Sequence, residues 1–144
     1  MLKTQIFSLL LILSPQCILS RRLVCFPPAG ALPNPLHCGE LIAALTYIAR
    51  GPGGDRLLSW GRHLPESDET QNLPVKYYVH RHEPQTCAVW VDLYHGDLFA
   101  IDRFRLSDVV SVAQNIILRC LIAENEIGMS ILIVRLQLML FFEP

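Results

Sequence analysis

Several familiar chemical signatures are missing from this 144-residue sequence. It contains no Gly-x-Ser-x-Gly, and its one glycine-rich run, residues 51–54, lacks the Gly-Lys-Ser/Thr ending of a phosphate-binding loop. Neither a nucleophile elbow nor a P-loop is therefore indicated. No Asn-x-Ser/Thr triplet occurs, so we expect no N-linked glycan. No Cys-x-x-Cys occurs either, which argues against a zinc knuckle or a redox motif.

Charge of either sign is also scarce. Twelve Lys and Arg residues stand against thirteen Asp and Glu residues, and Lys3 and Lys76 are the only lysines. No block of like charge occurs along the chain. The sequence therefore offers neither the basic surface that nucleic acid requires nor a polybasic patch for an anionic membrane. We expect no nucleic-acid partner.

The first twenty residues do show a clear pattern. Lys3 is followed by the mainly apolar run 6–13, then by helix-breaking Pro15, and a small residue, Ser20, stands at the end. This order is typical of a secretory signal, which we place at residues 1–20. The apolar run is about eight residues, far short of the roughly 20 that span a bilayer. We therefore expect a secreted, extracellular protein without a transmembrane anchor.

The cysteine count supports export. Five cysteines become four if the signal is removed together with Cys17. An even number of cysteines in a short exported chain predicts two disulfides, each of which would stabilise the fold by closing a long loop. Their spacing alone cannot choose among the three pairings that four cysteines allow. The four candidates are Cys25, Cys38, Cys87 and Cys120.

Beyond the signal, the chain divides into a short arm and one domain. Residues 21–34 are rich in proline and should form an extended arm, which begins with the dibasic pair Arg21-Arg22. Residues 35–144 are expected to form a single α+β domain. Within it, the stretch 51–74 is a long polar loop, and a loop of that length in a small domain is expected to be mobile or functional.

Two amphipathic helices are predicted, over 35–50 and about 107–123. Asn34 can cap the first helix, and Pro35 suits its first position because the missing N–H would have no helical partner there. Ser107 is expected to cap the second helix.

Three strands are predicted. The runs 75–80 and 86–93 are rich in β-branched and aromatic residues, and the segment 81–85 between them is a plausible hairpin connection. The terminal run 130–142 alternates apolar residues with polar ones in part of its length. We interpret it as one central strand with a semi-polar face.

These elements predict an α+β two-layer sandwich, with two helices on a three- or four-stranded antiparallel sheet. If residues 23–26 add a strand, the order becomes β-α-β-β-α-β, a ferredoxin-like arrangement. The two helices would then run antiparallel, which would bring Cys38 close to Cys120 and leave Cys25 for Cys87. We prefer this pairing from the sequence.

Three stretches carry a resemblance to a known group. The first helix opens with Pro35-Leu36-His37-Cys38, the central strand reads Thr86-Cys87-Ala88-Val89-Trp90-Val91-Asp92, and the second helix contains Ile116-Ile117-Leu118-Arg119-Cys120. Across most of residues 35–138, the sequence resembles small secreted cysteine-containing proteins of filamentous ascomycete fungi. The resemblance implies export, this fold and an effector-like or surface role, and it supplies no catalytic residue.

The strongest chemical candidates are two histidines near the hairpin. On a strand, His80 and His82 would share one face and could provide two ligands for zinc or copper. A third ligand would have to come from Glu83, His63 or His95. Together with Glu83 and Arg103, the same histidines provide the residue types that a small ribonuclease-like hydrolase uses for proton transfer. Two solvated histidines at a hairpin are the commoner case, so we assign no catalytic residue.

Three aspartates recur at intervals of five residues, namely Asp92, Asp97 and Asp102. Their spacing does not fit an EF-hand calcium loop. We therefore interpret them as solvated acids near a strand end, and we predict neither a metal nor a cofactor.

The favoured hypothesis is a non-enzymatic secreted protein that binds a protein or a glycan outside the cell. The loop 55–73 and the hairpin tip 81–85 are the surfaces expected to make contact, and Trp60 within the loop is expected to pack back onto the core. The alternative is a small secreted hydrolase or a metal-binding protein that uses His80 and His82. A decaying gene product, which would show no cooperative melting, is the third hypothesis.

Overall fold

The computed structural model describes residues 23–80, 85–93, 99–133 and 136–143, and its side chains as far as residue 130. The proposed signal at residues 1–20 lies outside these ranges. Helix α1 (Pro35–Arg50) is followed later by α2 (Leu106–Ile116), which continues as one π-helical stretch, η2 (Ile117–Ile122). The strands are β1 (Leu23–Phe26), β2 (Leu58–Gly61), β3 (Thr70–Asn72), β4 (Val75–Tyr78), β5 (Thr86–Leu93), β6 (Ile101–Phe104), β7 (Ile127–Ile133) and β8 (Leu136–Glu143).

Helix α1 has the bounds and the cap that its sequence predicts. The Asn34 side-chain oxygen accepts a hydrogen bond of 2.9 Å from the Leu36 N–H, and Pro35 occupies the first turn. One stripe of the helix is buried, and it consists of Cys38, Leu41, Ile42, Leu45 and Ala49. Local capping and the apolar period of 3.6 residues therefore agree, which is why this helix could be predicted.

The second helix begins one residue earlier than expected, at Leu106, and its cap comes from a distant part of the chain. The Asp55 carboxylate accepts hydrogen bonds from the Ser107 N–H at 2.9 Å and from the Ser107 hydroxyl at 3.0 Å. Asp108 accepts another, of 2.8 Å, from the Arg105 N–H. The expectation that Ser107 caps this helix is therefore wrong, because Ser107 lies inside the first turn and its N–H is satisfied by Asp55.

The strands form two sheets. The larger has the order β1-β7-β8-β5-β4, and every neighbouring pair in it is antiparallel. The smaller has the order β3-β2-β6 and contains one parallel pair, β2 with β3. The protein is therefore α+β, as predicted. A ferredoxin-like arrangement requires a parallel pair within the main sheet, so the observed order departs from that expectation.

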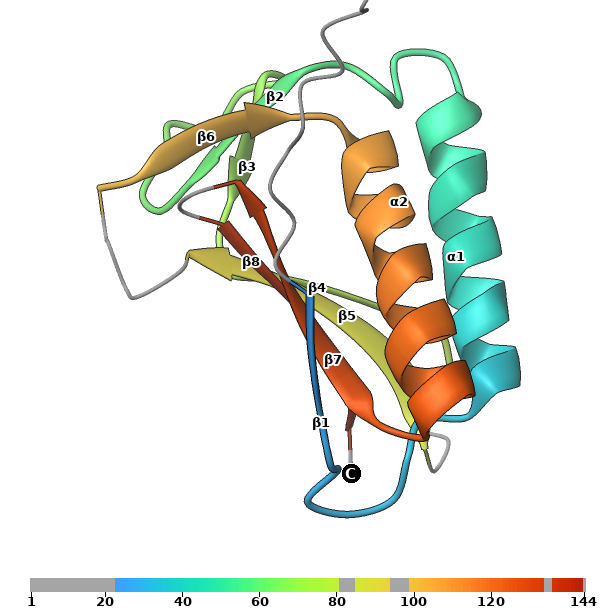
Figure 1. Cartoon of the computed structure of the whole chain (residues 1–144). Helices are drawn as coiled ribbons and strands as arrows, with labels where there is room; N and C mark the ends of the chain where they lie inside the picture. The colour runs from blue at the N-terminus through green and yellow to red at the C-terminus, as the bar shows by residue number, and fades with distance from the viewer. Residues whose placement is uncertain (1–22, 81–84, 94–98, 134–135, 144) are drawn as a thin grey trace, which may run out of the picture.

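Figure 1 shows how the layers lie. The two helices run side by side and antiparallel along one side of the large sheet, and the small sheet lies at the upper left. Helix α1 contacts β5, and α2 contacts β7 and β8. The expected extra strand at residues 23–26 is present as β1, which pairs with β7.

The predicted single strand over residues 130–142 is wrong. The segment is a hairpin in which β7 pairs antiparallel with β8, with Gly128 opposite Leu140 and Ser130 opposite Leu138. Strand β8 lies between β7 and β5. A strand alternates its side chains between two faces whether it continues or turns back, so the alternating pattern did not distinguish one long strand from two short ones.

The polar stretch 51–74 contains two strands, β2 and β3, and β6 was not predicted at all. These strands have only three or four residues each. Trp60 anchors them, because it is buried, stacks on Phe104 with ring centroids 4.3 Å apart, and donates a hydrogen bond of 3.1 Å to the Phe104 carbonyl. The expectation that Trp60 packs onto the core is confirmed.

Two disulfides are present, but they are not the preferred pair. Cys25 is bonded to Cys120, and Cys38 is bonded to Cys87. The antiparallel helices do place the start of α1 near the end of η2 (Figure 1). However, Cys38 and Cys120 both lie on buried helix faces, and each one is bonded to a cysteine of the sheet. The preferred pairing Cys38–Cys120 and Cys25–Cys87 is therefore wrong, because it assumed that neighbouring helices place their cysteines toward one another.

Gly128 allows the helix to approach the sheet at the first disulfide. It lies opposite Cys25 in the β1–β7 register. A Cβ atom at Gly128 would lie 2.4 Å from Ile116 Cγ2 and 2.7 Å from Cys120 Sγ. Only glycine can occupy this position without moving the helix away from β7.

Candidate functional site

The histidine cluster is only partly within the described residues. His80 follows β4 with a positive φ of 56°, and its Nε2 lies 2.5 Å from the Glu40 Oε2. Its ring also lies against His37, with centroids 5.0 Å apart. His80 thus contacts α1. His82 and Glu83, the other two weak candidates, lie outside the described residues.

The other candidates for the metal site, the calcium loop and the hydrolase are only partly within the described residues. His63 and Arg103 are described and exposed, whereas His95 and Asp97 lie outside the described ranges. Within those ranges, no three His, Cys, Asp or Glu side chains gather closely enough to hold a metal ion. The described residues therefore form neither the metal site nor the calcium loop that the sequence analysis considered.

The hairpin tip is attached to α1. The Gln85 carbonyl accepts a hydrogen bond of 2.9 Å from the Asn34 N–H, and the disulfide Cys38–Cys87 lies close by in the sequence. The Thr86 hydroxyl donates to the His80 carbonyl. Residues 81–84 of the expected contact surface 81–85 lie outside the described ranges, and the described end of this segment is fixed to the helix.

The main hollow near the small sheet is a pocket of about 650 Å³ that the sequence did not predict. It is lined by the end of β5, by the residues that follow β2, and by the end of β3 with the residues that join it to β4. We call it the junction pocket. Its lining residues are Arg62, His63, Asn72, Leu73, Pro74, Trp90 and Asp92.

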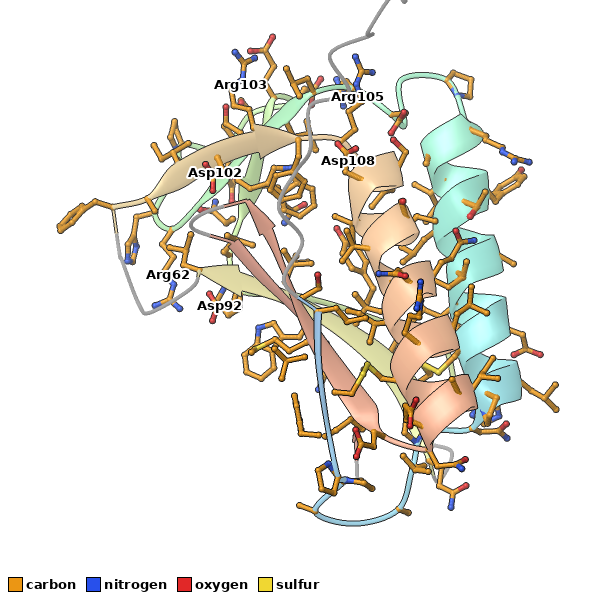
Figure 2. The ribbon with its side chains drawn as sticks, in the orientation of Figure 1. Arg62, Asp92, Asp102, Arg103, Arg105 and Asp108 are labelled. Atoms are coloured by element: carbon orange, nitrogen blue, oxygen red, sulfur yellow. A yellow bond between two sulfur atoms is a disulfide. The ribbon has the colours of Figure 1, made fainter. Side chains whose placement is uncertain are left out.

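An ion pair forms the polar part of the junction pocket. The Arg62 Nη2 donates to both Asp92 oxygens, at 2.8 and 3.0 Å, and Figure 2 shows the two side chains together. The Asp92 Oδ1 also accepts a hydrogen bond of 2.8 Å from the Leu93 N–H. The two side chains are 25% and 23% exposed. Both charges are thus largely removed from water but neutralise each other.

Arg62 retains unused donors. Its Nε is buried and has no hydrogen-bond partner among the described residues. Its hydrogen bonds with the described part of the chain all involve Nη2. A guanidinium carries five N–H donors, so the Nη1 group has donors left for a ligand.

Other residues that line the junction pocket are apolar. Trp90, on β5, is half-buried, and Leu73 and Pro74 contribute the segment between β3 and β4. An apolar wall with a few directional polar groups is the usual composition of a site for a small ligand, and the volume lies within the usual range.

The loop around the junction pocket is ordered by its own hydrogen bonds. The Asn72 side chain accepts a bond of 2.8 Å from the Leu64 N–H and donates one of 3.1 Å to the Leu64 carbonyl. The Leu73 N–H donates to the Gly61 carbonyl at 2.8 Å. These bonds connect the two chain segments that carry Arg62 and Pro74.

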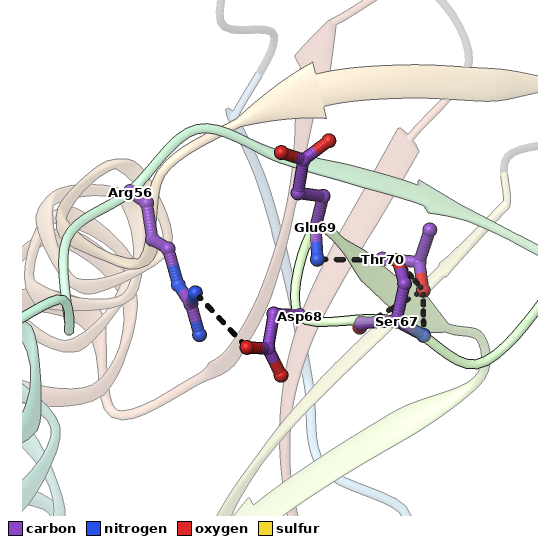
Figure 3. Close-up of polar contacts among 5 residues, drawn as sticks. All are labelled: Arg56, Ser67, Asp68, Glu69 and Thr70. Carbon is purple, nitrogen blue, oxygen red and sulfur yellow. Dashed lines mark hydrogen bonds and ion pairs between the residues drawn. The ribbon is translucent and has the colours of Figure 1, made fainter.

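The outer end of the same loop is a compact turn, shown in Figure 3. The Thr70 hydroxyl donates to the Pro65 carbonyl at 2.7 Å and accepts from the Ser67 N–H at 3.1 Å. An ion pair between Arg56 Nη1 and Asp68 Oδ2 spans 3.8 Å, but both side chains are exposed. The turn is therefore held by short polar contacts, and the ion pair contributes little.

A second, apolar hollow crosses the outer faces of the helices. Two adjoining pockets of about 420 and 350 Å³ share Gly39, Ile42 and Gln114. Exposed apolar side chains stand along these helices, namely Leu36, Tyr47, Ile48, Leu118 and Ile122. The shared floor offers one polar side chain, so it has less directional chemistry than the junction pocket.

Sequence reasoning missed the junction pocket because its residues are far apart. Arg62 and Asp92 are separated by 30 positions, and neither belongs to a recognised motif. From the sequence, Asp92 is interpreted as a solvated acid near a strand end, and His63 is one of three options for a third metal ligand. The sequence does place Asp92 near the end of the strongest predicted strand, and therefore a carboxylate near the edge of a sheet. It does not indicate that Arg62 is the partner of this carboxylate.

No protein-family model and no curated protein matches this sequence. In the described part of the chain, no helix has the length and apolar composition that a membrane span requires. The function of this protein must therefore be inferred from its own residues and their geometry.

Proposed function

We propose that this is an exported, disulfide-stabilised α+β protein that acts by binding a partner outside the cell, and that the junction pocket is its binding site. The observation that carries the proposal is the pair of disulfides, Cys25–Cys120 and Cys38–Cys87. Disulfides form and persist in oxidising compartments and are rare where cytosolic reductants are present. They support export together with the signal expected at residues 1–20.

Binding is favoured over catalysis by the positions of the polar groups. The junction pocket contains a neutralised ion pair and an apolar wall, which are features of recognition. His80, on which the hydrolase hypothesis rests, contacts Glu40 and does not line this pocket. The resemblance to small secreted fungal proteins supports an effector-like role, with an extracellular protein or glycan as the partner.

Export can be tested with the natural leader. The full chain would be expressed in a secretory host, and the mass of the product in the medium would be measured before and after reduction and alkylation. We expect a product that lacks residues 1–20, resists alkylation before reduction and gains four alkyl groups after it. The same mass reports whether Arg21-Arg22 is removed. A folded, unprocessed chain in the cytosol with all its thiols free would contradict the proposal.

The hydrolase alternative has its own test. The double variant His80→Ala, His82→Ala would be compared with the parent protein for cleavage of RNA and glycans and for bound metal. We expect no activity or metal in either protein. Activity in the parent that is lost in the variant would favour the enzyme hypothesis.

A further inference from the structure

The junction pocket offers hydrogen-bond donors and acceptors side by side. Arg62 is oriented by its bonds from Nη2 to Asp92, which leaves its Nη1 donors for a ligand. Asp92 accepts bonds from Arg62 and Leu93, and a carboxylate has about four acceptor sites. A ligand hydroxyl can accept a hydrogen bond from such a guanidinium and donate one to the adjacent carboxylate.

Charge in the pocket favours an uncharged ligand. The positive charge of Arg62 is paired with Asp92 at 2.8 Å, and the pair is about three-quarters buried. The Asp92 carboxylate beside the guanidinium would repel an anion, so its repulsion opposes the attraction of Arg62. The directional hydrogen bonds do not cancel, and an uncharged group with several hydroxyls can use them.

The apolar wall complements one face of a sugar ring. Trp90, Leu73 and Pro74 present apolar surface in the same hollow as the polar pair. A pyranose ring has C–H groups on its faces and hydroxyls at its edge, so it can lie on an aromatic or prolyl surface while its edge meets polar side chains. Aromatic side chains supply a large contact area of this kind.

The pocket is also held in shape before any ligand arrives. The Leu73 N–H donates to the Gly61 carbonyl. The Asn72 side-chain amide accepts a hydrogen bond from the Leu64 N–H and donates one to the Leu64 carbonyl. Groups that are already fixed lose less entropy when they bind a ligand.

We infer that the junction pocket binds an uncharged saccharide, with Trp90 and Pro74 against the ring face and the Arg62–Asp92 pair hydrogen-bonded to ring hydroxyls. This inference names the ligand class for the binding function proposed above and rests on it.

The test uses the full disulfide-bonded protein and five probes in calorimetric titrations. Cellobiose, maltose and N,N′-diacetylchitobiose are the uncharged probes, and digalacturonate and inorganic phosphate are the anionic ones. We expect at least one uncharged probe to bind at millimolar concentration and neither anion to compete with it. Tighter binding of phosphate or digalacturonate would overturn the inference, and so would the absence of binding by all three uncharged probes.

Three variants locate the binding. Trp90→Ala should weaken binding at least tenfold, whereas Trp90→Phe, which keeps an aromatic face, should weaken it less. The double variant Arg62→Gln, Asp92→Asn removes both charges without leaving one buried alone, and it should also weaken binding about tenfold. Tyr47→Ala is the matched control, because Tyr47 is an exposed aromatic residue on α1 outside the pocket.

The variants also separate this inference from the proposed function. Equal losses in Trp90→Ala and Tyr47→Ala would show that the saccharide binds elsewhere or without specificity. An exported product with both disulfides that binds no saccharide would overturn the ligand class and leave export standing. A chain that is retained in the cytosol but binds a saccharide would overturn export and leave the pocket standing.

Discussion

The two ends of this molecule are held together by different means. At the end that contains the start of α1 and the end of η2, two disulfides join the helices to the sheet. The other end, with β2, β3 and β6, is held by the Trp60–Phe104 stack, by the Asp55 contacts with α2 and by the Arg62–Asp92 pair. The described contacts at that end are all non-covalent.

This difference indicates which part of a small disulfide-bonded protein can carry a binding surface. At the cross-linked end, one disulfide joins strand β1 to η2 and the other joins α1 to β5. The cross-links therefore stabilise the scaffold, while the end without them carries the pocket. Binding residues generally lie on segments that a rigid scaffold positions.

The largest effect is expected at the cross-linked end. Serine substitution of both cysteines in Cys38–Cys87, or of both in Cys25–Cys120, would open loops with sequence separations of 49 and 95 residues. Chain entropy predicts losses in the free energy of unfolding of about 4 and 5 kcal/mol, respectively. Urea unfolding of the two double variants beside the parent measures this. A loss below about 1 kcal/mol in both would show that the disulfides are not what stabilises this end.

A slightly smaller effect is expected at the other end. Trp60→Ala should lower the free energy of unfolding by about 3–5 kcal/mol, because a buried aromatic side chain is removed. Trp60→Phe keeps an aromatic ring but loses the bond to the Phe104 carbonyl, so it should cost about 1 kcal/mol. Both variants should retain two disulfides by mass, and urea unfolding measures the loss.

Arg56→Ala is the control for the small sheet. Arg56 and Asp68 are exposed and 3.8 Å apart, so the change should cost less than about 0.5 kcal/mol. If Arg56→Ala destabilised the protein as much as Trp60→Ala, surface charge rather than aromatic packing would hold this end.

A pH-dependent effect concerns Tyr77 of β4, in the large sheet that connects the two ends. Burial raises the pKa of Tyr77 from 10.0 to about 12. The unfolded chain releases this proton at a lower pH than the folded chain. The contribution of Tyr77 to stability is therefore intact below pH 10 and is lost as the pH rises from 10 towards 12, by roughly 3 kcal/mol in total.

Tyr77→Phe tests this dependence. Between pH 10 and pH 12, the free energy of unfolding should fall less in the variant than in the parent, because the variant has no Tyr77 phenol to ionise. The absorbance of phenolate should also show one fewer group titrating near pH 12. Urea unfolding at pH 8 and pH 11, with both disulfides verified by mass, compares the two proteins. Equal declines in parent and variant would contradict a buried Tyr77.

Elements with strong local signals were predicted correctly. Helix α1 has its cap at Asn34 and its buried stripe where the sequence indicated, and β5 has the predicted bounds, 86–93. The elements that were missed are β2, β3 and β6, whose three or four residues are too few to show a period. These strands exist because Trp60 and Phe104 pack together, and that contact joins positions 44 residues apart.

The sequence by itself determined that the chain is α+β, that its helices are amphipathic and that its cysteines are numerous enough for two disulfides, because composition and local periodicity carry that information. Only the tertiary structure decided which cysteines are bonded, that the last segment folds back as a hairpin, and that Arg62 meets Asp92. These outcomes depend on which faces of distant segments are buried together, and no local pattern records such a choice.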